Sequence, residues 1–190
     1  MMESDLQRFL ARLRELAASS DHEAALDDSG MDTWEHEGTP LDAGVRAGLF
    51  DPETGVHVRA VEYSSAFEAP AGYPHGWPFL AGRDAWFIEV ASEGEEMHLV
   101  KWPDPFPADP LCDEIRTQLE DAGWHFTSAD EPGAADPGLR PRHVGWFVRG
   151  GDHRLLSLAS DGEEDALVLL AASPDQLWPG WGPTEGPWRS

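Results

Sequence analysis

The stretch AWFIEVASEGEEMHLVKW, residues 85–102, decides the fold class of this chain. Two runs rich in aromatic and β-branched residues, Ala85–Ala91 and Met97–Trp102, flank a short polar segment that contains Gly94. Such runs favour extended strands, and a glycine-bearing segment of this length between them is typical of a hairpin. The two strands of a hairpin are antiparallel. The stretch therefore predicts an antiparallel sheet.

Further strands follow from the same kind of pattern on both sides of this hairpin. One pair flanks a turn with proline early and glycine late, Pro52 and Gly55, and another flanks Gly150-Gly151-Asp152. The uniformly apolar run near the end is typical of a buried strand. The additional strands are expected at Val45–Phe50, Val56–Tyr63, Trp124–Phe126, Val144–Arg149, His153–Ala159 and Ala166–Ala171.

Two main helices are predicted, over residues 4–19 and 110–122. Ser4 and Gln7 have the spacing of a capping box, and leucines then recur at helical spacing through the first segment. In the second segment we expect Asp109 to cap the helix and Pro110 to occupy its first position. Gly123 stands where a residue with positive φ commonly ends a helix.

Helices set apart from runs of hairpin strands indicate an α+β fold with about 7–8 antiparallel strands. We expect one domain over residues 1–173, followed by a Pro/Trp-rich tail at 174–190. The run AWFI at residues 85–88 resembles GWFV at 145–148. This echo suggests a duplicated helix-plus-strands unit, with halves 1–102 and 103–173.

The net charge is −23 on 190 residues, from 36 acids against 13 lysines plus arginines. The chain has no Asn and one lysine, Lys101, which indicates a bacterial genome of high G/C content. That bias explains arginine over lysine but not the excess of acid, because Asp and Glu codons are neutral in this respect. Salt adaptation and attraction to a basic partner are the two causes left open. With 41% hydrophobic residues the chain is expected to fold rather than to be disordered.

The location and partners follow from the same composition. A single cysteine, Cys112, excludes an intrachain disulfide, and no apolar run is long enough to span a bilayer. The first residues lack the pattern of a signal peptide. An anionic surface repels bare nucleic acid and anionic lipid. We therefore expect a cytoplasmic monomer or homodimer that binds neither nucleic acid directly nor membranes.

Motifs that carry chemistry are missing from the sequence. The eight histidines never occur at zinc-finger spacing, and there is no phosphate-binding glycine motif and no nucleophile elbow. We therefore predict no catalytic residue, no metal ligand and no cofactor. An enzyme is the least favoured class, and it would use the hairpin that carries Arg149 and His153.

The favoured function is protein binding, most simply by an immunity or inhibitor protein that neutralises a basic toxin or enzyme. Complementary charge speeds the association of such pairs. A dimeric secretion or assembly chaperone and a nucleic-acid mimic are the alternatives.

The residues predicted to bind a partner are acids of the likely anionic segments and aromatic residues of the irregular stretch 64–84. A folded-in loop is an equal alternative for the aromatic residues. The full set is Asp27, Asp28, Asp32, Glu35, Glu37, Tyr73, Trp77, Phe79, Glu93, Glu95, Glu96, Asp104, Asp113 and Glu114.

Overall fold

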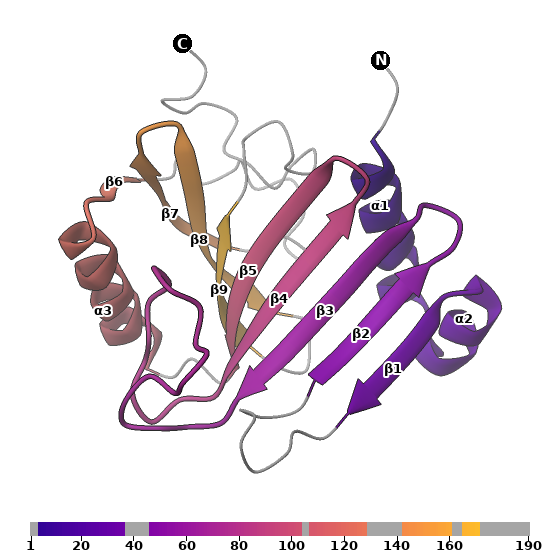
Figure 1. Ribbon diagram of the computed structural model, residues 1–190, viewed down its shortest axis with the longest axis horizontal. Helices are drawn as coiled ribbons and strands as arrows, with labels where there is room; N and C mark the ends of the chain where they lie inside the picture. Colours follow the sequence, from indigo (N-terminus) through magenta and orange to yellow (C-terminus); the bar gives the residue numbers. More distant parts are fainter. Residues whose placement is uncertain (1–3, 37–45, 104–106, 129–141, 161–164, 172–190) are drawn as a thin grey trace.

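A single nine-stranded antiparallel sheet organises the residues that the computed structural model describes, which are 4–36, 46–103, 107–128, 142–160 and 165–171. Its strand order is β1-β2-β3-β4-β5-β9-β8-β7-β6 (Figure 1). The chain thus builds one meander from β1 to β5 and a second from β6 to β9. The two meanders join where their last strands, β5 and β9, pair antiparallel. The predicted α+β class with antiparallel pairing is confirmed.

The elements in chain order are α1 (Asp5–Ala18), α2 (His22–Ser29), β1 (Asp32–His36), β2 (Arg46–Asp51), β3 (Val56–Tyr63), β4 (Ala85–Ser92), β5 (Glu95–Pro103), α3 (Ala108–Asp121), β6 (His125–Ser128), β7 (Arg142–Arg149), β8 (Asp152–Ser160) and β9 (Asp165–Ala171).

The strand count is higher than predicted because β1 was missed. Residues 32–36 are largely polar and lack the apolar alternation that identifies a half-buried strand. β1 pairs only with β2 within the described residues, so its place in the sheet depends on backbone bonds to a neighbour. The short helix α2 was expected only as a single turn near Glu23–Leu26.

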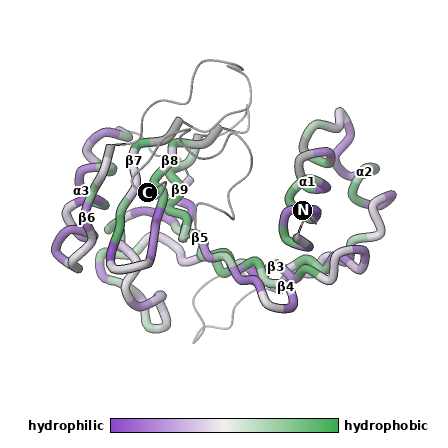
Figure 2. The backbone as a smooth tube through the Cα atoms, turned by 90° about the horizontal axis from the view of Figure 1, so that it is seen from above, coloured by the Kyte–Doolittle hydropathy of each residue, from purple (hydrophilic) through white to green (hydrophobic). Residues whose placement is uncertain are grey.

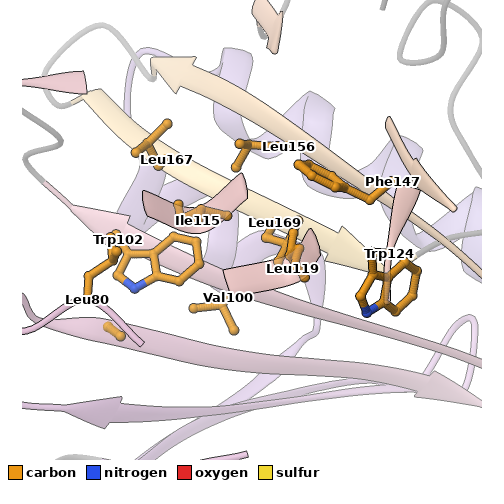
Figure 3. Close-up of a cluster of buried hydrophobic side chains, with 11 residues drawn as sticks. Leu80, Val100, Trp102, Ile115, Leu119, Trp124, Phe147, Leu156, Leu167 and Leu169 are labelled. Carbon is orange, nitrogen blue, oxygen red and sulfur yellow. The ribbon is translucent and has the colours of Figure 1, made fainter. Parts of the chain in front are cut away.

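The two faces of the sheet carry separate hydrophobic clusters. Successive residues on one strand alternate between them, as Trp146 and Phe147 do on β7. The α1 face holds Trp146 and packs against Leu6 and Phe9 of α1. The α3 face holds Phe147, Trp102 and the apolar side of α3 (Figure 3).

The helices cover different parts of the sheet. Figure 2 shows α1 and α2 on one side of β3 and β4, whereas α3 lies beside β6 and β7. The contacts agree, because α1 meets β3 and β4 while α3 meets β6. No described helix covers the α3 face over β1, β2 and β3. None of the helices in the described part of the chain is long and apolar enough to cross a membrane.

α1 begins and docks as its sequence suggests. The Ser4 hydroxyl accepts a bond from the Gln7 amide at 3.2 Å, and the Gln7 side chain accepts one from the Ser4 amide at 3.1 Å, which completes the predicted capping box. From the same helix Arg12 reaches the fully buried Asp51, with 3.1 Å between Nε and the carboxylate, and also pairs with Glu53. This ion pair fixes α1 to the β2–β3 hairpin.

α3 begins earlier than predicted. It starts at Ala108 after Pro107, no side chain caps it, and Asp109 lies within the first turn. The expected capping by Asp109 and first position for Pro110 are therefore wrong. The C-terminal prediction is right, because Gly123 has φ of 88° and the Trp124 amide bonds back to the Leu119 carbonyl at 2.9 Å.

The segment between β3 and β4 is a packed loop, residues 64–84. Gln118 of α3 binds the loop at Phe79 through two hydrogen bonds. Its side chain accepts one from the Phe79 amide at 2.8 Å and donates one to the Phe79 carbonyl at 2.7 Å. Leu80 is buried in the cluster of the α3 face. The loop therefore covers part of that face beside α3.

The duplicated unit stays a prediction. Each half does contain a helix followed by an antiparallel meander. The strands that carry the sequence echo, β4 and β7, do not occupy equivalent places, because β4 neighbours the central strand β5 whereas β7 neighbours the edge strand β6. The echo therefore does not mark matching strands. The predicted tail, 174–190, lies outside the described residues.

Candidate functional site

Exposed acids gather at the end of the molecule formed by α2 and β1, where the two elements lie side by side (Figure 1). α2 is capped by Asp21, whose carboxylate accepts from the Ala24 amide at 3.1 Å, and it ends at Gly30 with φ of 73°. No residue of α2 is buried. We call the group of exposed acids the acidic surface, and its members are Asp21, Glu23, Asp27, Asp28, Asp32 and Glu35.

Contacts from α1 hold the acidic surface in place. Arg12 donates to the carbonyl of Ser29 at the end of α2, at 2.9 Å, while it also pairs with Asp51 of β2. Met31, between α2 and β1, is buried in the cluster of the α1 face. These contacts hold α2 next to β1. Because residues 21–35 contain no lysine or arginine, no base of this segment offsets its six acids.

Four predicted partner-binding acids, Asp27, Asp28, Asp32 and Glu35, are thus brought together. The others are dispersed over different parts of the fold. Glu37 and Asp104 lie outside the described residues. The separated acids are Glu93, Glu95 and Glu96 at the β4–β5 turn, and Asp113 and Glu114 exposed on α3.

The predicted loop aromatics are packed against the protein body. Tyr73 stands edge-on to both Tyr63 and Phe79, with ring centroids 5.2 and 5.4 Å apart, and its hydroxyl donates to the Pro78 carbonyl. Trp77 packs edge-on to Phe87 of β4 at 5.6 Å. Burial raises the pKa of the Tyr73 phenol, and the nearby Tyr63 adds to the shift. The structure therefore shows the folded-in alternative for Tyr73, Trp77 and Phe79, whereas Phe67 of the same loop is 90% exposed.

Trp34 is an exposed aromatic residue that was not among the predicted binding residues, as is Phe67. It lies on β1 between acids of the acidic surface and is 41% exposed. Its indole ring rests on Gly48, the residue directly opposite on β2, where any Cβ would overlap the ring. Glycine inside a strand is the available signal, because it often marks a close approach by another group.

A part of the α3 face over which no described helix lies extends from Trp34 across the sheet, and we call it the open face. The register aligns Trp34, Gly48, Arg59, Glu89 and His98 in one row across β1 to β5. The next row on the same face consists of Asp32, Phe50, His57, Ala91 and Glu96.

The two rows mix charges and rings. Phe50 and His57 stack with centroids 4.6 Å apart, and Arg59 is exposed between acid-bearing strands. Aromatic residues and arginine are enriched where proteins meet, and dense single-sign charge is not. The open face therefore differs in character from the neighbouring acidic surface.

One group of potential metal ligands lies on the open face. Glu89, Glu96 and His98 bring one ligand atom each within 4.8 Å of one another. The His98 Nε2 atom is 2.9 Å from a Glu96 carboxylate oxygen and 3.4 Å from a Glu89 oxygen. Sequence spacing hides this group, because Glu89 and His98 come from different strands and meet only through the β4–β5 register.

The residues proposed for an enzyme do not converge. Arg149 lies over the Trp124 ring on the α3 face, at 4.7 Å, whereas His153 stands edge-on to Trp146 of the α1 face. The neighbouring Arg154 lies between Trp77 and Trp124, 4.0 and 4.5 Å from their ring centroids. Burial, with Arg149 nearby, lowers the pKa of Arg154 to about 10, so it stays charged at neutral pH. These arginines serve as packing cations for the aromatic cluster.

Comparisons with protein-family models, with curated proteins and with solved structures found no match for this chain.

Proposed function

We propose that this protein binds a basic protein partner through the acidic surface, as an immunity or inhibitor protein does. The observation that carries the proposal is the gathering of exposed acids on and beside α2 and β1, with one exposed tryptophan, Trp34, on the open face of the same edge strand. Interfaces of this kind combine a buried aromatic anchor with a charged rim. A partner that reaches around the edge strand β1 would meet both, with Trp34 as its anchor and the acids at the border of the contact.

Electrostatics supports the same assignment. The six acids lie on one short helix and one edge strand, with the whole chain at a net charge of −23. A field of one sign raises the rate of association with an oppositely charged partner toward about 10⁸–10⁹ M⁻¹s⁻¹ at low salt. The same field disfavours self-association and acidic partners, which adds selectivity.

The test compares partner binding by two variants, one that loses negative charge at the acidic surface and one that loses the same charge elsewhere. The first variant carries Asp27→Asn, Asp28→Asn, Asp32→Asn and Glu35→Gln. The matched control neutralises four exposed acids of α3, with Asp109→Asn, Asp113→Asn, Glu114→Gln and Asp121→Asn. Both lose four negative charges, so any effect of net charge alone is the same.

Each immobilised protein is used to capture basic proteins from a lysate of its own host at low salt. We expect the wild type and the α3 control to retain one basic protein that high salt elutes, and the first variant to lose it. Retention of the same proteins by both variants, or capture that salt leaves unchanged, would contradict the proposal.

A chaperone-like homodimer is the second candidate, and the observation that favours it is the exposed Trp34 on a sheet face over which no described helix lies. Such a dimer would bury the open face against a second copy. Sizing chromatography with light scattering separates the two candidates. A dimer that Trp34→Ala converts to a monomer supports the chaperone, whereas a strict monomer supports the binding of a basic partner.

A further inference from the structure

We propose that Glu89, Glu96 and His98 form a site for a divalent transition-metal ion, with Zn²⁺ as the best match. All three side chains lie on the open face, at the end of the β4–β5 hairpin. Glu89 is directly opposite His98, and Glu96 precedes His98 by two residues on the same strand. The alternation of strand residues therefore turns the three ligands to one side.

The distances between donor atoms fit a zinc ion. Bonds of about 2.0–2.2 Å from Zn²⁺ to nitrogen and oxygen, arranged as a tetrahedron, place neighbouring donors roughly 3.3 Å apart. The separations of 2.9 and 3.4 Å from His98 Nε2 to the two carboxylates lie on either side of that value. The two carboxylate oxygens, which lie within 4.8 Å of each other, would also have to close on the ion through side-chain rotation.

The histidine ring is held in place by its surroundings. His98 stacks on Phe87, with ring centroids 5.7 Å apart and an angle of 22° between the planes. Phe87 is in turn packed edge-on by Trp77 from the loop 64–84. A ring that is already oriented loses little freedom when it binds a metal, so its stacking favours affinity.

The type of ligand selects the type of metal. One imidazole nitrogen with two carboxylates suits Zn²⁺ and its neighbours in the transition series better than Mg²⁺ or Ca²⁺, which prefer oxygen ligands. Three protein ligands leave a fourth position for water or for a group of a partner. The side chains are accessible to an ion from solvent, with His98 30% exposed and Glu96 59% exposed.

Arg59 is the nearby group that opposes a cation. It is the cross-strand neighbour of Glu89 on β3, on the same face. Its charge disfavours a metal ion at short range, while the net charge of −23 attracts cations at longer range. Removing the Arg59 charge should therefore raise the affinity for the metal ion. The proposal can thus be tested by a variant that binds the ion more tightly than the wild type.

The experiment is calorimetric titration of the tag-free full chain with Zn²⁺, in a non-chelating buffer that contains excess Mg²⁺. The Mg²⁺ occupies acids that bind cations without selectivity. We expect one Zn²⁺ ion per chain, with affinity at least about tenfold weaker in His98→Gln and in Glu89→Gln. Arg59→Gln should bind more tightly by about twofold or more.

His57→Gln is the matched control. His57 also stacks on an aromatic ring of the open face, Phe50, but its cross-strand neighbour on β4 is Ala91 rather than a carboxylate. Its loss should leave Zn²⁺ affinity unchanged. If His98→Gln fails to fold by circular dichroism, the exposed Glu96→Gln takes its place under the same criteria.

Two results would overturn the proposal. One is the lack of a saturable Zn²⁺ site in the presence of Mg²⁺. The other is equal affinity in the wild type and the ligand variants, which would leave His98 as an ion-pair partner of the two glutamates. The side-chain nuclear magnetic resonance signals of His98 provide an independent readout, since they should shift with Zn²⁺ and not with Mg²⁺.

Discussion

The two edges of the sheet use the same packing device with different outcomes. At one edge Trp34 of β1 lies on Gly48 of β2, and at the other Phe126 of β6 lies on Gly145 of β7. In both, the glycine of the inner strand lets an aromatic ring of the edge strand lie flat against the backbone. A glycine in a strand weakens it, and a ring placed over it restores packing.

The edges differ in what lies above the ring. Arg116 of α3 stands over Phe126, 4.1 Å from the ring centroid, and Phe126 packs against the buried cluster. Trp34 remains 41% exposed and is bordered by the acidic surface. The same device therefore completes the core at β6, whereas at β1 it presents a large apolar group to solvent. The β1 edge thus exposes the ring that the β6 edge covers, as the proposed binding role of Trp34 requires.

The largest expected effect is on stability, from filling the two glycine positions. A Cβ at Gly145 would overlap the Phe126 ring and lie 2.9 Å from the Thr127 carbonyl oxygen, in a buried position. We expect Gly145→Ala to lower the free energy of unfolding by about 2–3 kcal/mol. The three atoms nearest to a Cβ at Gly48 all belong to the indole of the half-exposed Trp34, which can swing toward solvent, so Gly48→Ala should cost less than about 1 kcal/mol. Urea unfolding of both variants provides the measurement, and equal costs would remove the distinction between the edges.

Removal of the exposed ring tests its role in binding. Trp34→Ala should weaken binding of the basic partner by about 2 kcal/mol, roughly 30-fold, because anchors of this type dominate interface energies. Its free energy of unfolding should change by less than about 1 kcal/mol. Phe126→Ala is the counterpart at the other edge, and we expect it to reduce stability while leaving affinity intact. The opposite pattern, with Trp34 needed for folding, would make both edges structural.

A smaller effect concerns the loop that covers the α3 face. Tyr73→Phe removes the hydrogen bond to the Pro78 carbonyl, which should cost about 1 kcal/mol at neutral pH. The pKa of the Tyr73 phenol is raised in the folded state, whereas in the unfolded chain it is near 10.0. As pH rises above about 10, the unfolded state loses its proton first, so wild-type stability falls.

The Tyr73→Phe variant should therefore lose less stability than the wild type over the same alkaline range. Urea unfolding at neutral pH and at about pH 10.5 measures both quantities. Equal slopes in the two proteins would show that the phenol ionises as easily in the fold as in the unfolded chain. That result would mean that the Tyr73 phenol is as accessible to solvent as the Trp34 ring at the β1 edge.

The smallest effect is expected from the cation over Phe126. Arg116→Ala removes an exposed contact of a cation with a ring, and we expect a loss of about 0.5 kcal/mol. Glu120→Gln is the control, because it removes only the ion pair between Arg116 and Glu120, which lie 2.9 Å apart along α3. Urea unfolding of both variants separates the two contributions. Identical losses would mean that the ring contact contributes nothing.

Much of the fold could be predicted from local pattern. The hairpins β2–β3, β4–β5 and β7–β8 carry turn residues between strand-forming runs, and the start of α1 and the end of α3 carry their capping residues. The local sequence pattern did not predict β1, because its residues lack the alternation of apolar and polar side chains. The local pattern also gave the wrong start for α3, because Asp109, a residue type that favours the cap position, lies inside the first turn.

The candidate sites could be predicted only in part. Acids of the segment 21–35 were identified from charge alone, since exposure of charged residues is the usual outcome. Trp34 was not, because whether a tryptophan is covered depends on elements distant in sequence. The ligand group of Glu89, Glu96 and His98 depends on which residue of β4 faces which residue of β5, and a one-residue slip would turn the side chains to opposite faces.

Short-range backbone preferences and composition were enough to predict the α+β class, the three tight hairpins, the two long helices and the excess of acid. The pairing of β5 with β9, which joins the two meanders into one sheet, becomes visible only in the folded molecule. That pairing places α3 over one half of a sheet face, and no described helix lies over the other half. The physical reason is that non-local pairing depends on the total burial of both faces, which no single segment encodes.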